Sequence, residues 1–187
     1  MRFEETALAG AFIVDLDRRV DSRGFFARAF CRREFEERGL APTVDQVNVG
    51  RSTRQGTVRG MHFQYPPHAE AKLIRATRGA ILDVGIDLRP ESPTFLGHVA
   101  VELTADDGRA LYLPERFAHG YQTLVDGAEV MYFTSAPYTP ASESGLSPLD
   151  PRLGIAWALP VTEMSAKDAD ARRLDELEPE LAARMRV

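Results

Sequence analysis

Cysteine and tryptophan each occur only once in this sequence of 187 residues. A single cysteine, Cys31, excludes an intramolecular disulfide and fits a reducing compartment. No uninterrupted apolar run approaches the ~20 residues of a membrane span, and residues 1–10 lack the basic segment and long apolar segment of a secretory signal. We therefore expect no membrane segment and a cytoplasmic location.

Positive charge is also scarce, since 23 Lys and Arg face 28 Asp and Glu for a net charge of −5. This balance argues against a general nucleic-acid binder, because phosphate backbones are held mainly by clustered Lys and Arg, although it is compatible with a local anion site. The hydrophobic fraction of 44% and charged fraction of 27% are ordinary for a globular protein. The length suits one core, so we expect a single domain over residues 1–187.

Short runs rich in Val, Ile, Leu, Thr and aromatic residues fill residues 45–133, and turn signals such as Arg78-Gly79 and Asp126-Gly127 separate them. Within residues 80–87, alternation puts two acids, Asp83 and Asp87, on the face opposite to Leu82, Val84 and Ile86. Regular short strands without long helices between them predict an all-β sandwich, jelly roll or barrel.

Two segments have helical patterns. Residues 31–38 are charged, with Phe35 as their main apolar anchor and Gly39 as a stop signal. Residues 165–185 are rich in Ala, Leu, Glu and Arg. We expect this C-terminal tail to cover an end of the barrel or a partner subunit.

Polar side chains stand inside several predicted strands. Alternation over residues 58–64 groups Arg59 with Met61 and Phe63 on one face, and puts His62 on the other. If the strands wrap into a small barrel, inward side chains would converge in one cavity suited to proton transfer. The candidates for that cavity are His62, Lys72, His119 and Tyr132.

Each candidate also has a structural interpretation. A strand His or Tyr is more often a hydrogen-bonded or packing residue, Lys72 could extend to water, and Arg59 could pair with Asp83 or Asp87. A metal site is a further alternative, since small β-barrels often hold a metal through a His-x-His pair. Neither His62 nor His119 has such a pair, so we expect no metal.

Ordered sequence motifs run through nearly the whole chain. The most specific are the segments at residues 59–64, Arg-Gly-Met-His-Phe-Gln, and at residues 117–120, Phe-Ala-His-Gly. Other motifs lie at residues 21–26, 46–48, 72–73, 87–94, 138–145, 150–157 and 165–168. Together these motifs resemble the dTDP-4-dehydrorhamnose 3,5-epimerase family.

The resemblance implies a cupin-type jelly-roll β-barrel with short peripheral helices, usually a homodimer, acting without metal or organic cofactor. It implies an isomerase that inverts carbons 3 and 5 of dTDP-4-keto-6-deoxy-D-glucose, giving dTDP-4-keto-L-rhamnose in deoxysugar biosynthesis. His62 would be the base and Asp168 would orient it. Tyr132 would face His62 across the sugar, and Lys72 would stabilise the developing oxyanion.

Substrate-binding positions follow from the same resemblance. It assigns the diphosphate to Arg23, Arg59 and Lys167, the nucleoside to Gln46 and Asn48, and base stacking to Phe26, for which a neighbouring subunit is one source. His119 would support the sugar site, with Tyr138 and Glu143 as further pocket residues. Asp168 also has a structural alternative, because residues 165–168 form a helix-capping pattern with a carboxylate at the third position.

Departures from the family pattern leave alternatives open. Arg28 stands where many members have Glu, and Pro148-Leu149 replaces a Trp-Asn pair before Asp150. The nucleotide base and the number of inverted carbons therefore stay open, and a 3-only or 5-only epimerase is the first alternative. A catalytically silent sugar-binding module and a metal-dependent cupin enzyme are the others.

Overall fold

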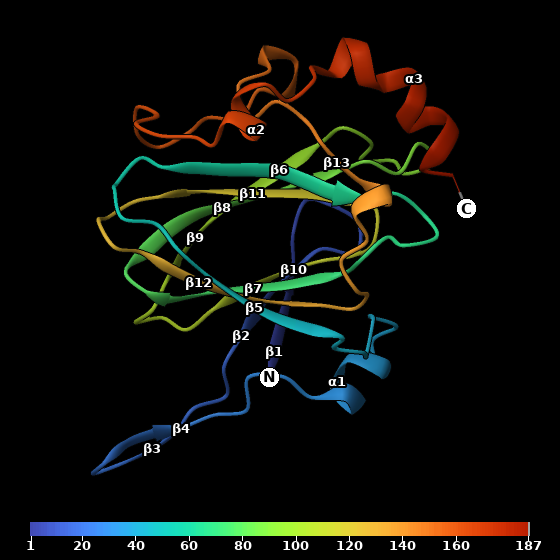
Figure 1. Ribbon diagram of the computed structural model, residues 1–187. Helices are drawn as coiled ribbons and strands as arrows, with labels where there is room; N and C mark the ends of the chain where they lie inside the picture. The colour runs from blue at the N-terminus through green and yellow to red at the C-terminus, as the bar shows by residue number, and fades with distance from the viewer. Residues whose placement is uncertain (187) are drawn as a thin grey trace.

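The computed structural model describes residues 1–186, and two antiparallel sheets dominate this part of the chain (Figure 1). The six-stranded sheet has the order β1 (Arg2–Glu5), β2 (Phe12–Asp15), β10 (Ala110–Leu113), β7 (Lys72–Arg78), β12 (Glu129–Thr134) and β5 (Gln46–Arg51). The five-stranded sheet has the order β13 (Glu143–Gly145), β6 (Val58–Gln64), β11 (Phe117–Thr123), β8 (Ala80–Asp87) and β9 (His98–Thr104).

The two sheets face each other across an apolar core (Figure 1). Ile74 of β7 and Val130 of β12 meet Ile81 of β8 and Leu103 of β9 in that core, all fully buried. The prediction of an all-β jelly roll with a few short helices is confirmed.

Alternation in β8 follows the pattern expected from the sequence. Ile81 packs between the sheets, whereas Val84 and Ile86 belong to a second core on the outer face of the five-stranded sheet. Asp83 shares the inward face with Ile81, and it is fully buried. This strand therefore delivers a carboxylate to the space between the sheets.

Strand β6 departs from simple alternation, and the predicted face of Arg59 is wrong. His62 pairs with His119 of β11 while Arg59 pairs with Tyr121, so three steps along β6 match two along β11. The extra residue is a β-bulge, which reverses the facing of the side chains before it. A Cβ at Gly60, where φ is +119°, would lie 2.5 Å from the Cα of Gly120, so only glycine fits the bulge. Arg59 and His62 consequently face the same cavity.

The C-terminal tail is two helices, α2 (Ala166–Ala169) and α3 (Leu174–Arg184), rather than one continuous segment. The carboxylate of Asp150 accepts a hydrogen bond from the backbone N–H of Leu174 at 2.6 Å, which fixes the start of α3. Leu177 and Leu181 of α3 are fully buried in the outer core of the five-stranded sheet. The tail thus covers a sheet face of its own subunit, and the expected covering of a barrel end is wrong (Figure 1).

The N-terminal region covers part of the six-stranded sheet and also extends beyond it. Helix α1 (Arg32–Glu36) is shorter than predicted, and its Phe35 packs edge-on against Phe3 and Tyr112. Strands β3 (Arg19–Asp21) and β4 (Gly24–Phe26) form a hairpin that projects away from the barrel (Figure 1). Val20 and Phe26 on this hairpin are 75% and 74% exposed.

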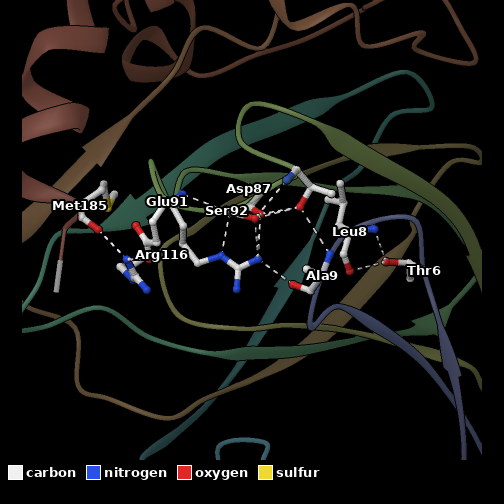
Figure 2. Close-up of polar contacts among 10 residues, drawn as sticks. Thr6, Leu8, Ala9, Asp87, Glu91, Ser92, Arg116 and Met185 are labelled. Atoms are coloured by element: carbon white, nitrogen blue, oxygen red, sulfur yellow. Dashed lines mark hydrogen bonds and ion pairs between the residues drawn. The ribbon is translucent and has the colours of Figure 1, made fainter.

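A polar cluster fastens the N-terminal loop to the end of β8. Asp87, fully buried, accepts hydrogen bonds from Arg89 and from the hydroxyls of Ser92 and Thr94 at 2.6–2.8 Å. Arg89 also donates to the carbonyl of Ala9 at 2.6 Å. Figure 2 shows Asp87 and Ser92 beside Ala9 of that loop. Short 3₁₀ turns lie at Pro140–Ser142 and Pro151–Leu153. Within residues 1–186, no helix is long and apolar enough to cross a membrane.

Candidate active site

A cavity of about 500 Å³ opens between the two sheets. The five-stranded sheet contributes Arg59, His62, His119, Tyr121 and Glu143, and the six-stranded sheet contributes Gln46, Asn48, Val49, Gly50, Lys72, Tyr132 and Thr134. Glu70 and Tyr138 line it from adjoining loops. The structure therefore brings together the four side chains expected to converge, His62, Lys72, His119 and Tyr132.

His62 forms a close pair with Asp168 of α2. Its Nε2 lies 2.6 Å from Oδ1 of Asp168, whose other oxygen accepts the backbone N–H of Gly60 at 3.4 Å. An ionised carboxylate only accepts hydrogen bonds, so Nε2 carries the proton and Nδ1 keeps a free lone pair. Burial raises the pKa of Asp168, but the hydrogen bond and charge of His62, together with hydrogen bonds from Ser165 and Gly60, outweigh burial and leave the pKa below its usual value. The pair is thus equipped to act as a base.

Asp168 also belongs to a helix cap. Its backbone N–H donates to Oγ of Ser165 at 3.1 Å at the start of α2, as the capping pattern predicts. Its side chain does not complete a capping box, because the carboxylate points to His62 and Gly60 instead. The backbone N–H of Asp168 therefore takes part in the helix cap, while its carboxylate accepts a hydrogen bond from the imidazole of His62.

Lys72 is buried on the opposite sheet, with only 8% of its side chain exposed, and it does not extend to water. Its Nζ lies 3.0 Å from Oε1 of Glu70 and donates to the carbonyl of His62 at 3.3 Å. Glu70 was not predicted from the sequence, because it precedes β7 and lies outside the strand alternation. The pair puts a cation close to the candidate base.

Tyr132 lies on β12, in the sheet opposite to His62. Burial and the negative charge of Glu70 raise the pKa of Tyr132, and the positive charge of Arg59 opposes them. The phenol consequently stays protonated at neutral pH. The cavity thus has an imidazole on one wall and a protonated phenol on the other.

His119 forms a second histidine–carboxylate pair. Its Nε2 lies 2.7 Å from Oδ1 of Asp83, while Oδ2 of Asp83 has no hydrogen-bond partner among the described residues.

Arg59 does not pair with Asp83 or Asp87, because its guanidinium donates to Ser52 Oγ at 3.1 Å and to a backbone carbonyl. Arg59 is therefore held at the cavity wall with its charge uncompensated by either acid.

The rim of the cavity carries a second group of predicted residues. Glu143 accepts hydrogen bonds from Tyr138 Oη at 2.8 Å and Lys167 Nζ at 2.6 Å, and Gln46 accepts the backbone N–H of Tyr138 at 3.1 Å. A neighbouring cavity of about 360 Å³ shares Arg59 and His62 with the first cavity. Its charged lining consists of three cations, Arg51, Arg59 and Lys167, and two acids, Glu163 and Asp168. This arrangement offers an anion site beside the base.

Arg23 and Phe26 lie on the projecting hairpin and do not line either cavity. Arg23 forms an exposed ion pair with Asp21 at 2.7 Å. Across residues 1–186, no three His, Cys, Asp or Glu side chains gather in an arrangement that could hold a metal ion.

Fold and site together define a class of protein: a jelly-roll enzyme whose cavity brings together a histidine that is hydrogen-bonded to a carboxylate, a tyrosine and a lysine. The profile described as dTDP-4-dehydrorhamnose 3,5-epimerase matches residues 5–176. The chain belongs to the dTDP-4-dehydrorhamnose 3,5-epimerase family.

Individual relatives agree over nearly the full length. A dTDP-4-dehydrorhamnose 3,5-epimerase of Salmonella typhimurium is 40% identical over 174 residues, covering 92% of this chain and 94% of the relative. The crystal structure of the enzyme of that name from Elizabethkingia anophelis matches with a TM-score of 0.91 at 33% identity, covering 94% and 97% of the two chains. The Legionella pneumophila epimerase in complex with dTDP-4-keto-L-rhamnose matches with a TM-score of 0.89 at 34% identity, covering 96% of each.

Proposed function

We propose that this protein inverts carbons 3 and 5 of dTDP-4-keto-6-deoxy-D-glucose to give dTDP-4-keto-L-rhamnose. The observation that carries the proposal is the position of His62 and Tyr132 on opposite sheets with one cavity between them. Inversion needs a base on one face of the sugar and an acid on the other. The relative from Legionella pneumophila, crystallised with dTDP-4-keto-L-rhamnose, supports the choice of substrate.

Proton abstraction begins at His62. The lone pair of Nδ1 takes the proton from the carbon beside the 4-keto group, and the C–H electron pair moves into the ketone to form an enolate oxygen. Asp168, 2.6 Å from Nε2, stabilises the imidazolium that results. Lys72 donates to the enolate oxygen, and one such positioned donor is commonly worth about 3 kcal/mol in the transition state.

Reprotonation comes from the other wall. The phenol of Tyr132 delivers a proton to the opposite face of the carbon, which inverts the centre and leaves no net change in atoms or oxidation state. The phenolate then regains a proton from solvent, and His62 loses its own to solvent. Solvent hydrogen therefore enters each inverted carbon.

The nucleotide end of the substrate occupies the rim. Arg59 and Lys167 neutralise the diphosphate in the second cavity, beside His62. Gln46 and Asn48, on the edge strand β5, meet the nucleoside. His119 supports the sugar, while Tyr138 and Glu143 close the pocket at its rim.

We further propose that the protein is a homodimer in which each hairpin serves the partner's site. Arg23 and Phe26 lie outside the cavities of their own chain, and the hairpin exposes Val20 and Phe26 to solvent. The edge strand β5 exposes Val47 and Val49, at 51% and 60%, so a second copy that covered both surfaces would bury apolar area. Arg23 and Phe26 of that copy would then reach the diphosphate and the base.

Complementation between two inactive variants tests this arrangement. One variant carries His62→Ala with an intact hairpin, and the other carries Arg23→Ala and Phe26→Ala with His62 intact. If each hairpin serves the partner's site, mixed dimers contain one complete site and regain activity. A mixture that forms mixed dimers but stays inactive would show that the hairpin serves its own chain.

The reaction itself is tested by incubating the protein with dTDP-4-keto-6-deoxyglucose in deuterated water and analysing the sugar by NMR. Deuterium at carbons 3 and 5 is the expected result. Deuterium at a single carbon would mean a monoepimerase. A sugar without deuterium would contradict the proposal and direct attention to another nucleotide sugar or to a binding role.

A further inference from the structure

Glu70 is an ionisable group on the cavity wall that the proposed reaction does not use. Its side chain is 12% exposed, and it lies on the loop that leads into β7. Besides the ion pair with Lys72, its Oε2 accepts a hydrogen bond from the amide of Gln64 at 3.3 Å. A nearly buried carboxylate is stable only when partners compensate its charge, so these two contacts fix where Glu70 stands.

The first consequence concerns Lys72. A lysine ammonium has three N–H donors on a flexible stem, and many rotamers would carry it away from the reacting atoms. Here one N–H donates to the carbonyl of His62 at 3.3 Å, while Oε1 of Glu70 attracts the same nitrogen from 3.0 Å. These two contacts hold the ammonium beside the base and leave donor capacity for a substrate oxygen.

The amide of Gln64 extends this support to the rim. It donates to the carbonyls of His68 and Pro137 at 2.9 and 3.1 Å, as well as to Glu70. Glu70 is therefore anchored to β6 and to the loop that carries Tyr138, and not to Lys72 alone.

The second consequence concerns Tyr132. The groups that raise or lower the pKa of its phenol are, after burial, the negative charge of Glu70 and the positive charge of Arg59. The cavity is also faced by further ionisable groups, which are Lys72 on β7, His62 on β6, His119 and Tyr121 on β11, Glu143 on β13 and Tyr138 on the rim loop. Glu70 is the carboxylate among the lining residues that acts on Tyr132.

We infer that Glu70 is a positioning residue for both sides of the proton transfer: it fixes the Lys72 ammonium beside His62, and it places a negative charge in the cavity that the Tyr132 phenol also lines. This inference rests on the proposed function, in which Lys72 donates to the enolate oxygen and Tyr132 reprotonates the carbon. Glu70 itself touches neither the substrate nor the reacting atoms in this scheme.

Glu70→Gln is the informative variant, because it keeps the size of the side chain and removes its charge. Without the ion pair, Lys72 leaves its fixed position for part of the time, so kcat should fall about ten-fold while KM changes little. Without the negative charge, the pKa of Tyr132 falls. An acid catalyst is lost as the pH rises through its pKa, so the alkaline limb of the pH–rate profile should move to lower pH.

Deuterium exchange into the sugar, measured against pH, supplies the kinetic readout. The matched control is Glu129→Gln on β12, the strand of Tyr132, because Glu129 accepts from Thr77 and does not line the cavity. An ultraviolet titration of tyrosinate, compared with Tyr132→Phe to isolate one phenol, supplies a readout that needs no turnover. We expect Glu70→Gln to titrate Tyr132 at lower pH, and Glu129→Gln to match the wild type in both assays.

The exchange assay and the tyrosinate titration give different results when the proposed function is wrong and when only the role of Glu70 is wrong. If the wild type incorporates no deuterium, the proposed function fails, and the titration still shows whether the charge of Glu70 acts on Tyr132. If the wild type exchanges normally but Glu70→Gln matches it in kcat, pH profile and titration, Glu70 is only structural and the inference is overturned.

Discussion

Replacing Asp168 with Asn tests the centre of the site with a change of one atom. In the wild type, the carboxylate accepts from Nε2 of His62 at 2.6 Å, so the proton resides on Nε2 and Nδ1 has the lone pair that the proposed reaction uses. An asparagine amide can donate to Nε2 instead, which moves the imidazole proton to Nδ1. The substrate would then face an N–H, and the base would be lost for most of the time although the ring stays in place.

The expected decrease in rate follows from the two contributions of the Asp168 carboxylate that the substitution removes. A positioned general base contributes on the order of 10²–10⁴ in rate, and the substitution removes both the correct tautomer and the charge that stabilises the imidazolium. We therefore expect kcat for deuterium incorporation to fall by about 10³-fold. Stability should change little, by about 1 kcal/mol or about 2–4 °C in Tm, because Asn still fills the buried position.

Ser165→Ala is the matched control, since it removes the cap of α2 and leaves the carboxylate of Asp168 facing His62. Loss of a cap costs about 1 kcal/mol, so Tm should fall by about 2–4 °C while the exchange rate stays within a few-fold of wild type. Were Asp168→Asn to resemble Ser165→Ala, losing stability and keeping its rate, Asp168 would be a capping residue alone and the tautomer argument would be refuted.

Three further predictions concern His62, Tyr132 and the buried Asp87 cluster. His62→Ala should abolish exchange while circular dichroism and Tm show an intact fold, and a wild-type rate would remove the assignment of the base. Tyr132→Phe should permit proton removal but not delivery to the second face, so NMR should find deuterium in sugar that is not inverted; normal inversion would reduce Tyr132 to packing. Asp87→Asn should destabilise the protein by about 3 kcal/mol in denaturant unfolding at neutral pH. Hydrogen bonds from Arg89, Ser92 and Thr94 outweigh burial and lower the pKa of Asp87, so its contribution is present above the unfolded value of 3.8 and lost as pH falls through the native one. The gap between wild type and variant should close in acid, and a gap that persists there would exclude the ionised cluster as its source.

Alternation and motif order were sufficient to predict the main parts of the site. The period of two in residues 80–87 correctly separates Asp83 from Val84 and Ile86, because a strand between two cores has only two faces. Polar residues within otherwise apolar strands correctly predict the cavity. Burying His62 or Lys72 in an apolar core without partners would cost free energy, so both side chains lie where Asp168 and Glu70 can pair with them.

The errors share a physical origin in contacts between segments distant in the sequence. Strand alternation predicts the wrong face for Arg59, because the bulge depends on how closely Gly60 of β6 approaches Gly120 of β11. The composition of residues 165–185 predicts helix throughout the tail, yet Asp150, 24 residues before Leu174, fixes where α3 starts. The sequence does not predict Glu70 as a site residue, because the local pattern of a loop gives no sign that Glu70 forms an ion pair with Lys72 of β7.

The jelly roll itself explains why a base and an acid can act on the two faces of one ring. Packed sheets lie about 10 Å apart, and side chains from both normally fill that gap. Here polar side chains replace apolar ones at one end of the gap, so His62 from one sheet and Tyr132 from the other border an open space instead of a packed core. A sugar ring held between the sheets would present one face to each wall. Proton removal and delivery would then need no rotation of the ring, because His62 and Tyr132 are fixed to separate hydrogen-bonded sheets whose spacing the apolar core maintains.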